Sequence, residues 1–214
     1  MKVAIALSGL PRLSNVTSAS WGRIIGKFNA DVFIHTWCQS PEIDQIVYDQ
    51  LNLMFNPKII RIDPLLNIDV SPYPNRHWPC IDVYRSLSMW NSIKFAHNMI
   101  LEYSSYDIII RGRLDWYVKN LEIITYDSLV LPYDTDKFVL QFDYKGQKVY
   151  GYNDAFAYGN VDNMSKYVNT LDLIYDLYTN EGVDYCPENF LTASLIRQNV
   201  PLILQKMEQK LIRG

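Results

Sequence analysis

VAIALSGLPR, residues 3–12, begins with five apolar residues in a row and breaks at Gly9 and Pro11. A short apolar run that ends in turn-forming residues is typical of a buried strand followed by a turn. We therefore expect a first strand over residues 3–7 and a turn over residues 8–12.

The residues that follow alternate between helix and strand patterns. Residues 21–28 carry Trp, Ile, Ile and Phe at the spacing of one face of an amphipathic helix. Residues 31–35 (DVFIH) and 58–62 predict two further strands. Between them, Ser-Pro-Glu at 40–42 predicts a helix start, because it combines a capping hydroxyl, a first-turn proline and an acid near the positive end of the helix dipole. The order strand-helix-strand-helix-strand predicts a parallel sheet with helices packed on it.

The rest of the chain predicts more elements of the same two kinds. Residues 63–79 contain four prolines and predict either a functional loop, which His77 and Trp78 favour, or a disordered insertion. Three consecutive isoleucines at 108–110 predict a central strand. Further strands are expected at 138–142, 155–159 and 201–204, and further helices at 86–103, 164–178 and 187–195.

Composition excludes several classes of protein. The net charge is −3 and no basic stripe is present, which argues against a duplex nucleic-acid binder. The apolar run at 3–7 is too short to span a membrane. Cys38, Cys80 and Cys186 are odd in number and far apart, so we expect reduced thiols in a cytoplasmic protein rather than a disulfide framework or a zinc site. No stretch has the composition of a linker, so residues 1–214 are expected to form a single domain.

The polar residues that follow the predicted strands are the candidate ligand contacts, because ligands of open α/β sheets bind outside the carboxyl ends of the strands. Ser8, Gly9 and Arg12 follow the first strand. Glycine allows the backbone to approach a ligand closely, and arginine can hold a phosphate with two hydrogen bonds. The alternative is a plain turn between a strand and a helix.

Arg111, Arg113 and Asp115 follow the isoleucine strand, and alternate positions of an extended chain point to one side. Two guanidinium groups could neutralise a diphosphate, and the carboxylate could bind a divalent ion or a sugar hydroxyl. The alternative is a structural Arg–Asp ion pair at the edge of the sheet. We favour a binding function, because three charged groups at the end of a buried strand cost desolvation energy.

Other polar residues are weaker candidates. Asp154 comes just before an apolar segment and is either a turn cap or a site carboxylate. Glu188 is in the first turn of a predicted helix, where an acid interacts favourably with the helix dipole and needs no other role. Arg85 and Lys94 flank the start of the long helix, where either could reach a phosphate or remain solvated. His35, at the end of the second strand, is interpreted as a hydrogen-bonded structural residue.

Several segments, taken in order, resemble those of small glycosyltransferase-like proteins of bacterial and viral polysaccharide gene sets. The resemblance extends over nearly the whole chain, and it is specific to the family rather than to a donor or an acceptor. The matching segments are residues 6–12 (ALSGLPR), 31–37 (DVFIHTW), 106–115 (YDIIIRGRLD) and 153–159 (NDAFAYG), the helix with Met164 and the Pro187-Glu188 helix start.

The resemblance implies a GT-A-like fold, that is, a Rossmann-like, mixed but mainly parallel central sheet flanked by helices. Residues 1–118 would form its nucleotide-binding half and residues 119–214 its acceptor half. It implies transfer of a sugar from a nucleoside diphosphate sugar to an acceptor hydroxyl in polysaccharide biosynthesis. The Asp-x-Asp sequence that holds the metal in such enzymes would fall at residues 113–115, where an arginine stands in place of the first acid. Arg113 could supply the charge of the metal, while Asp115 could still bind Mn²⁺ or Mg²⁺.

On this basis the candidate residues receive roles. The nucleotide would be held by Ser8, Gly9 and Arg12, with Arg85 and Lys94. The diphosphate would be bound, with or without metal, by Arg111, Arg113 and Asp115. Asp154 or Glu188 would face the acceptor and act as base if the enzyme inverts configuration, whereas a retaining enzyme needs no dedicated base.

Two other functions stay open. A non-catalytic nucleotide- or carbohydrate-binding protein of the same fold would explain the missing acid of the metal motif. A different Rossmann-like enzyme, such as a methyltransferase, is disfavoured by the glycine-poor first loop and by the lack of an acid at the end of the second strand. No feature of the sequence indicates an oligomeric state.

Overall fold

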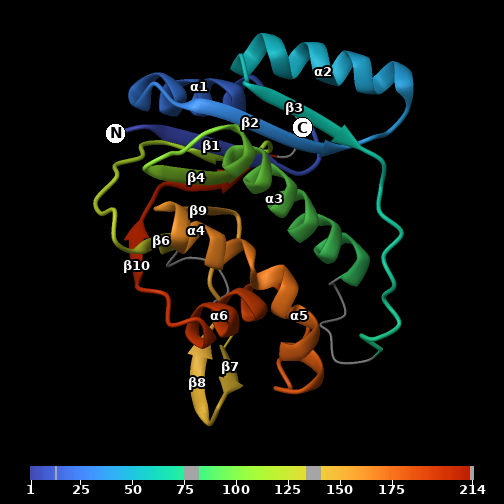
Figure 1. Ribbon diagram of the computed structural model, residues 1–214, viewed down its shortest axis with the longest axis vertical. Coiled ribbons are helices and arrows are strands. Elements are labelled where there is room, and N and C mark those ends of the chain that lie inside the picture. Colours follow the sequence, from blue (N-terminus) through green and yellow to red (C-terminus); the bar gives the residue numbers. More distant parts are fainter. Residues whose placement is uncertain (13, 75–81, 134–140, 213–214) are drawn as a thin grey trace.

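The computed structural model describes residues 1–12, 14–74, 82–133 and 141–212. Its centre is a seven-stranded sheet with strand order β10-β6-β9-β4-β1-β2-β3 (Figure 1). Strand β9 pairs antiparallel with β4 and β6, and the other neighbours pair in parallel. The strands of this sheet are β1 (Val3–Ser8), β2 (Asp31–Trp37), β3 (Ile59–Asp63), β4 (Ile108–Arg113), β6 (Leu129–Tyr133), β9 (Phe156–Gly159) and β10 (Leu202–Lys206).

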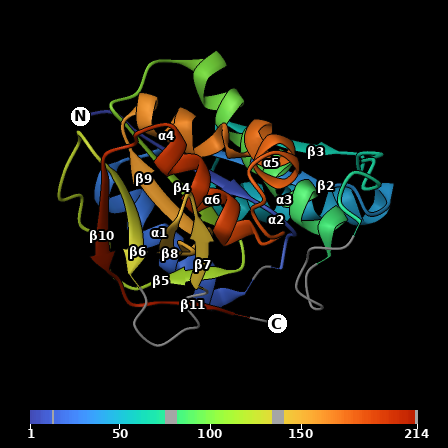
Figure 2. The same ribbon diagram turned by 90° about the horizontal axis from the view of Figure 1, so that it is seen from below.

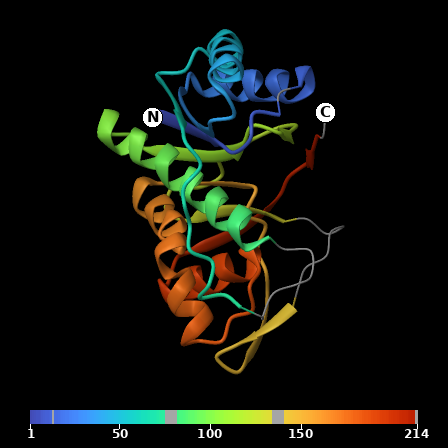
Figure 3. The same cartoon turned by 90° about the vertical axis from the view of Figure 1, so that its right-hand side faces the viewer.

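Helices cover both faces of the sheet (Figures 1 and 3). One face packs against α1 (Asn15–Phe28) and α2 (Pro41–Phe55), and the buried apolar residues there form one cluster. The other face packs against α3 (Val83–Tyr103), which crosses it diagonally, and against three further helices. These are α4 (Val161–Val168), α5 (Thr170–Thr179) and α6 (Pro187–Arg197). Within the described residues, no helix is long and apolar enough to cross a bilayer.

The strand-helix alternation expected for the first 62 residues is confirmed. Ser40 caps α2 by accepting a hydrogen bond from the backbone N–H of Ile43, and Pro41 is the first residue of that helix. Helix α3 begins at Val83, three residues before the expected start, because the side chain of Asp82 caps it by accepting from the N–H of Arg85. The α/β class and the mainly parallel sheet are therefore as the sequence predicts.

Three expectations about the second half of the chain need correction. The sequence does not predict strand β6, because Pro132 interrupts a short apolar run. The proline is tolerated in this strand because β6 pairs with β9 only at Val130. The single helix expected over 164–178 is two helices, since Asn169 ends α4 and begins α5. The strand expected at 138–142 corresponds to β7 (Gln141–Tyr144), which lies outside the main sheet. Residues 138–140 of the expected strand are outside the described part of the chain.

Two small antiparallel sheets lie beside the main one (Figure 2). Strand β7 forms a hairpin with β8 (Gln147–Tyr150), and the turn residues Lys145 and Gly146 have φ angles of 51° and 77°, as a tight hairpin turn requires. Strand β5 (Trp116–Val118), which directly follows β4, pairs with β11 (Gln209–Leu211). This second pair brings the end of the chain beside the turn that contains Asp115, whose carbonyl accepts a hydrogen bond from the N–H of Ile212.

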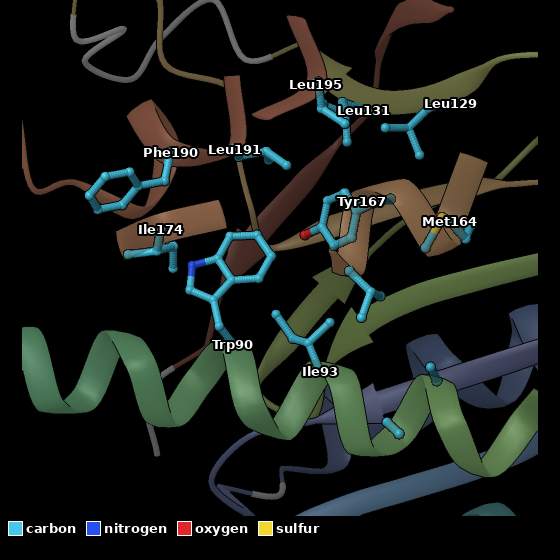
Figure 4. Packing of buried hydrophobic residues seen from close by; sticks show 14 of the residues in the cluster. Trp90, Ile93, Leu129, Leu131, Met164, Tyr167, Ile174, Phe190, Leu191 and Leu195 are labelled. Carbon is cyan, nitrogen blue, oxygen red and sulfur yellow. The ribbon is translucent and has the colours of Figure 1, made fainter. Parts of the chain in front are cut away.

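The core between α3 and the later helices closes one side of the sheet (Figure 4). Trp90 of α3 packs against Tyr167 of α4 with ring centroids 5.6 Å apart, and both side chains are fully buried. The ring of Tyr167 thus carries its hydroxyl into the space between the sheet and α3. Leu191 and Leu195 of α6 complete this layer (Figure 4).

Candidate functional site

Strand register brings three of the polar strand ends together. Ser8, the last residue of β1, lies opposite His35 of β2 and opposite Arg113 of β4. The chain leaves β1 toward β2 on one side, while β4 lies on the other side, so the strand order reverses between β1 and β4. Such a reversal leaves a crevice at the carboxyl ends of the strands, and this is where α/β proteins bind their ligands.

Arg113 and Asp115 form an ion pair with two hydrogen bonds. The Nε–Oδ1 and Nη2–Oδ2 distances are both 2.8 Å. The Asp115 side chain is 6% exposed and that of Arg113 is 29% exposed, so the carboxylate is enclosed while the guanidinium reaches the surface. The structural ion pair that the sequence left open is therefore present. Within the described residues, it leaves Nη1 as the nitrogen of Arg113 that is available to a ligand.

Arg111 is fully buried and has no charged partner among the described residues. It lies between Ala6 of β1 and Ala157 of β9, two small residues that leave room for its side chain on the sheet. Its Nη1 donates to the backbone carbonyl of Asp154, which also accepts from the hydroxyl of Tyr167 at 2.8 Å. Nε and Nη2 have no hydrogen-bond partner in the described part of the chain. A buried cation without a counter-charge is costly, so this group is a strong indication of an anionic ligand.

Two carboxyl groups lie near these arginines. Asp154 is buried just before β9, where its negative charge acts on Arg113, and Glu188 is half-buried in the first turn of α6. Burial, and then the negative charge of Asp154, raise the pKa of the Glu188 carboxyl above its ordinary value. The thiol of Cys186 donates to Oε2 of Glu188 at 2.9 Å. A carboxyl group whose charged form is disfavoured in this way is suited to accept and release a proton.

Two of the predicted nucleotide contacts pair with other residues, and a third is exposed. Arg85 is 86% exposed and pairs with Asp82 at the start of α3. The Nζ of Lys94 binds Asp172 of α5 at 2.6 Å. Arg12 is exposed in the turn after β1, and its guanidinium makes no ion pair with any described residue. The structure thus brings together Ser8, Arg111, Arg113, Asp154 and Glu188, which we call the carboxyl-edge site.

Sequence reasoning missed a hydrogen-bonded chain at the same edge. Nδ1 of His35 is 2.7 Å from the hydroxyl oxygen of Ser92 on α3, and Nε2 is 3.2 Å from Oδ2 of Asp63 at the end of β3. The backbone N–H of Gly9 donates to the same Ser92 oxygen at 3.3 Å. Burial lowers the pKa of His35 to about 4, against a smaller opposite effect of Asp63. His35 is therefore neutral at pH 7 and structural, as its position suggested.

The Ser92, His35 and Asp63 side chains have the composition of a hydrolase triad, but the serine is not a nucleophile here. Ser92 lies in the middle of α3 rather than at an exposed turn after a strand, and its hydroxyl bonds the ring of His35 and the N–H of Gly9. No local sequence pattern predicts this series of hydrogen bonds, because Asp63 and Ser92 lie 28 and 57 residues after His35.

The described residues do not offer a metal-binding set at Asp115. Both of its carboxylate oxygens face Arg113, and a second acid is absent at position 113. Within the described residues, no group of three or more His, Cys, Asp or Glu side chains is placed to hold a metal ion. The donor set that the resemblance implies for Mn²⁺ or Mg²⁺ therefore does not fit here.

Two surface hollows lie away from the carboxyl-edge site. One, of about 320 Å³, is lined by residues that include Asp31 at the start of β2, and the other, of about 270 Å³, by residues that include Tyr106 just before β4. Both positions are at the opposite edge of the sheet. His77, Trp78 and Cys80 lie outside the described residues, whereas Cys38 and Cys186 are free thiols.

Comparison with known proteins adds no identification: no protein-family model matches the chain, and no curated protein matches it significantly.

Proposed function

We propose that the protein is a glycosyltransferase of GT-A-like fold that moves a sugar from a nucleoside diphosphate sugar to an acceptor hydroxyl. The observation that carries the proposal is the buried guanidinium of Arg111, whose Nε and Nη2 are left without partners by the described residues. It lies next to β1, on the side where the strand order reverses. An anionic ligand bound there would supply the missing counter-charge, and because Arg111 is fully buried its binding requires a local opening of the carboxyl-edge site.

A diphosphate matches the groups available at this edge. Arg111 and Arg113 are two residues apart on β4 and so point to the same side of the sheet. Nε and Nη2 of Arg111 and Nη1 of Arg113 have no hydrogen-bond partner among the described residues. Ser8 is buried opposite Arg113, and its hydroxyl forms no hydrogen bond within the described residues. Two guanidinium groups and a hydroxyl can bind two adjacent phosphates.

Stabilisation of the leaving nucleoside diphosphate would be the main catalytic effect. Charge accumulates on the diphosphate as its bond to the sugar breaks, and fixed cations lower the energy of that state without rearranging. Arg113 is held in place by the two bonds to Asp115, so it is preorganised for this role. No step in this mechanism uses a metal ion, because the described residues do not form a set of metal ligands at Asp115.

Glu188 is the better candidate for the acceptor base. Burial, and then the negative charge of Asp154, disfavour the charged form of Glu188 and raise its pKa. Glu188 is also less buried than Asp154. A base at this position would take the proton of the attacking hydroxyl, as an inverting transferase requires.

The second candidate is a nucleotide- or carbohydrate-binding protein without catalytic activity. The observation that favours it is the ion pair of Asp115, which occupies the one acid left from the metal motif. This protein would bind nucleoside diphosphates with the same arginines but would not break the bond to the sugar.

A ligand panel with matched variants tests the proposal. Thermal unfolding is measured with UDP, GDP, CMP and their sugars, with and without Mn²⁺, for the wild type, Arg111→Met and Arg85→Met. Because ligand binding stabilises the native state, one nucleotide series should raise the Tm of the wild type and of Arg85→Met, and not that of Arg111→Met. Release of free nucleotide in the presence of an acceptor separates the enzyme from the binding protein. A Tm that no nucleotide changes would contradict both.

A further inference from the structure

The turn after β1 is hydrogen-bonded to a side chain of α3, the long helix on one face of the sheet. Gly9 has φ +110°, a conformation that favours glycine, and its N–H points to the hydroxyl of Ser92 on α3. This hydrogen bond fixes the plane of the Ser8–Gly9 peptide. Ser8 belongs to the carboxyl-edge site, so the orientation of this peptide affects the position of a site residue.

The direction of the hydrogen bonds between Gly9, Ser92 and His35 follows from the carboxylate of Asp63, which is bound to the other side of the His35 ring. A carboxylate only accepts hydrogen bonds, so the contact between Asp63 and His35 places the ring proton on Nε2. Nδ1 of the neutral ring must then accept, and the Ser92 hydroxyl donates its proton to it at 2.7 Å. The lone pairs of that oxygen are left to accept from Gly9. Arg61 pairs with Oδ2 of Asp63 at 2.5 Å and holds the carboxylate in place.

We propose that Ser92 is a positioning residue for the Ser8–Gly9 peptide of the proposed nucleotide site, and that His35 and Asp63 set the direction of its hydroxyl. We name Gly9, Ser92, His35 and Asp63 the Ser92 relay. Its role in ligand binding rests on the proposed function, whereas its effect on Gly9 does not.

The relay is suited to positioning because its two central side chains, those of Ser92 and His35, are enclosed. Ser92 and His35 are fully buried, and the ring of His35 is packed against Trp37 and Phe95 with centroids 4.8 and 5.0 Å away. A hydroxyl at an open surface could rotate and exchange its partner with water. Here its proton has one strong acceptor, since the other candidate, the carbonyl of His35, is 3.4 Å away.

Hydrogen exchange of the Gly9 amide tests the relay without any ligand. The exchange rate is expressed relative to that of Leu7 inside β1, so that general destabilisation cancels. In Ser92→Ala the Gly9 amide should exchange about tenfold faster relative to Leu7, the effect of losing one hydrogen bond of average strength. An unchanged ratio would overturn the relay.

Two substitutions of His35 separate the two halves of the relay. Asn places an acceptor near the position of Nδ1 and preserves the bond from Ser92, whereas Gln reaches the position of Nε2 and preserves only the bond to Asp63. Both lose the ring packing, so they control for each other. We expect His35→Asn to retain slow exchange at Gly9 and His35→Gln to lose it. The opposite order, or equal ratios, would overturn the role of His35.

The affinity for UDP or GDP completes the test. If the wild type binds one of them, Ser92→Ala and His35→Gln should weaken binding about tenfold and His35→Asn should not. Faster exchange at Gly9 with unchanged affinity would overturn the positioning role. A wild type that binds neither nucleotide contradicts the proposed function, and the exchange rates at Gly9 then decide the relay by themselves.

Discussion

Arg113 is clamped by Asp115 from a position only two residues further along the chain, at the turn where β4 ends. The planar guanidinium has its nitrogens in a fixed fork, so two bonds to one carboxylate fix the direction of the third nitrogen as well. The ion pair therefore holds the turn after β4, and it also fixes the direction of the Arg113 nitrogen that is available to a ligand. Its two partners differ in exposure, and the enclosed one is the acid.

Asp115→Asn should destabilise the protein and weaken nucleotide binding together. The substitution removes the charge that compensates a partly buried guanidinium, and we expect a loss of about 2 kcal/mol in the free energy of unfolding. Urea denaturation measures this, and the control is Asp82→Asn, which breaks the exposed pair of Arg85 and retains a good helix cap. An equal loss in the free energy of unfolding in the two variants would show that the Asp115–Arg113 pair stabilises the protein no more than the exposed Asp82–Arg85 pair.

Arg111→Met should have the opposite effect on stability. The substitution replaces a buried charge without a counter-ion by an apolar side chain of similar length, and the carbonyl of Asp154 retains its bond from Tyr167. We expect the free energy of unfolding to rise by about 1 kcal/mol while nucleotide binding is lost. A variant that is much less stable than the wild type would indicate that Arg111 has a structural role instead.

Gly112→Ala should disrupt the packing of α1 against β4. A Cβ at this position would lie 2.2 Å from two ring atoms of Trp21, whose indole N–H donates to the carbonyl of Arg113. We expect a loss of about 3 kcal/mol in urea denaturation, because Trp21 is fully buried and has no room to move. Gly22→Ala on the exposed side of α1 is the control and should cost nothing.

The clash should also couple the two positions. In the double variant with Trp21→Leu, alanine at position 112 should cost at least about 1 kcal/mol less than it does in the wild-type background. Purely additive effects would contradict a direct contact between Gly112 and the ring.

The strands and helices of the first, parallel half of the fold can be predicted from the sequence, because each has a local signal, either an apolar run or a helix cap. The second half was harder to predict. Pro132 hides β6, and the antiparallel direction of β9 depends on pairing with strands that are distant in sequence. Such pairings leave no local pattern.

The candidate site was predictable where it follows from strand ends. Ser8, Arg111 and Arg113 lie on neighbouring strands of the sheet and Asp115 lies in the turn that follows, so the rule that ligands bind at the carboxyl ends of strands groups them from the sequence alone. Side chains on helices were not predictable in this way. Lys94 is a predicted nucleotide contact but pairs with Asp172, 78 residues away. No sequence pattern points to Ser92, although it contacts Gly9.

Glu188→Gln should stabilise the protein at neutral pH and not in acid. The raised pKa of Glu188 means that folding disfavours its charged form, so the penalty is absent below the ordinary pKa of 4.5 and grows as the pH rises toward the folded-state pKa. Removing the charge should therefore increase stability at pH 7 more than at pH 4. The exposed Glu102→Gln on α3 is the control. If Glu188 is the base, the same variant should also slow sugar transfer about 100-fold.

Two buried histidines should make the protein sensitive to mild acid. Burial lowers the pKa of His35 and of His97, each to about 4 from an ordinary 6.5. Between these values the unfolded chain binds protons that the folded chain does not, so stability falls as the pH drops from 6.5 toward 4.

His97→Gln tests this with little loss of structure, since glutamine can still bond the hydroxyl of Ser165, which lies 3.1 Å from Nε2 of the histidine. Each histidine should contribute a slope of up to about 1.4 kcal/mol per pH unit in this range. Urea denaturation at pH 7, 6 and 5 should therefore show a smaller decline for His97→Gln than for the wild type. Parallel declines would mean that His97 accepts a proton in the folded state as readily as in the unfolded one.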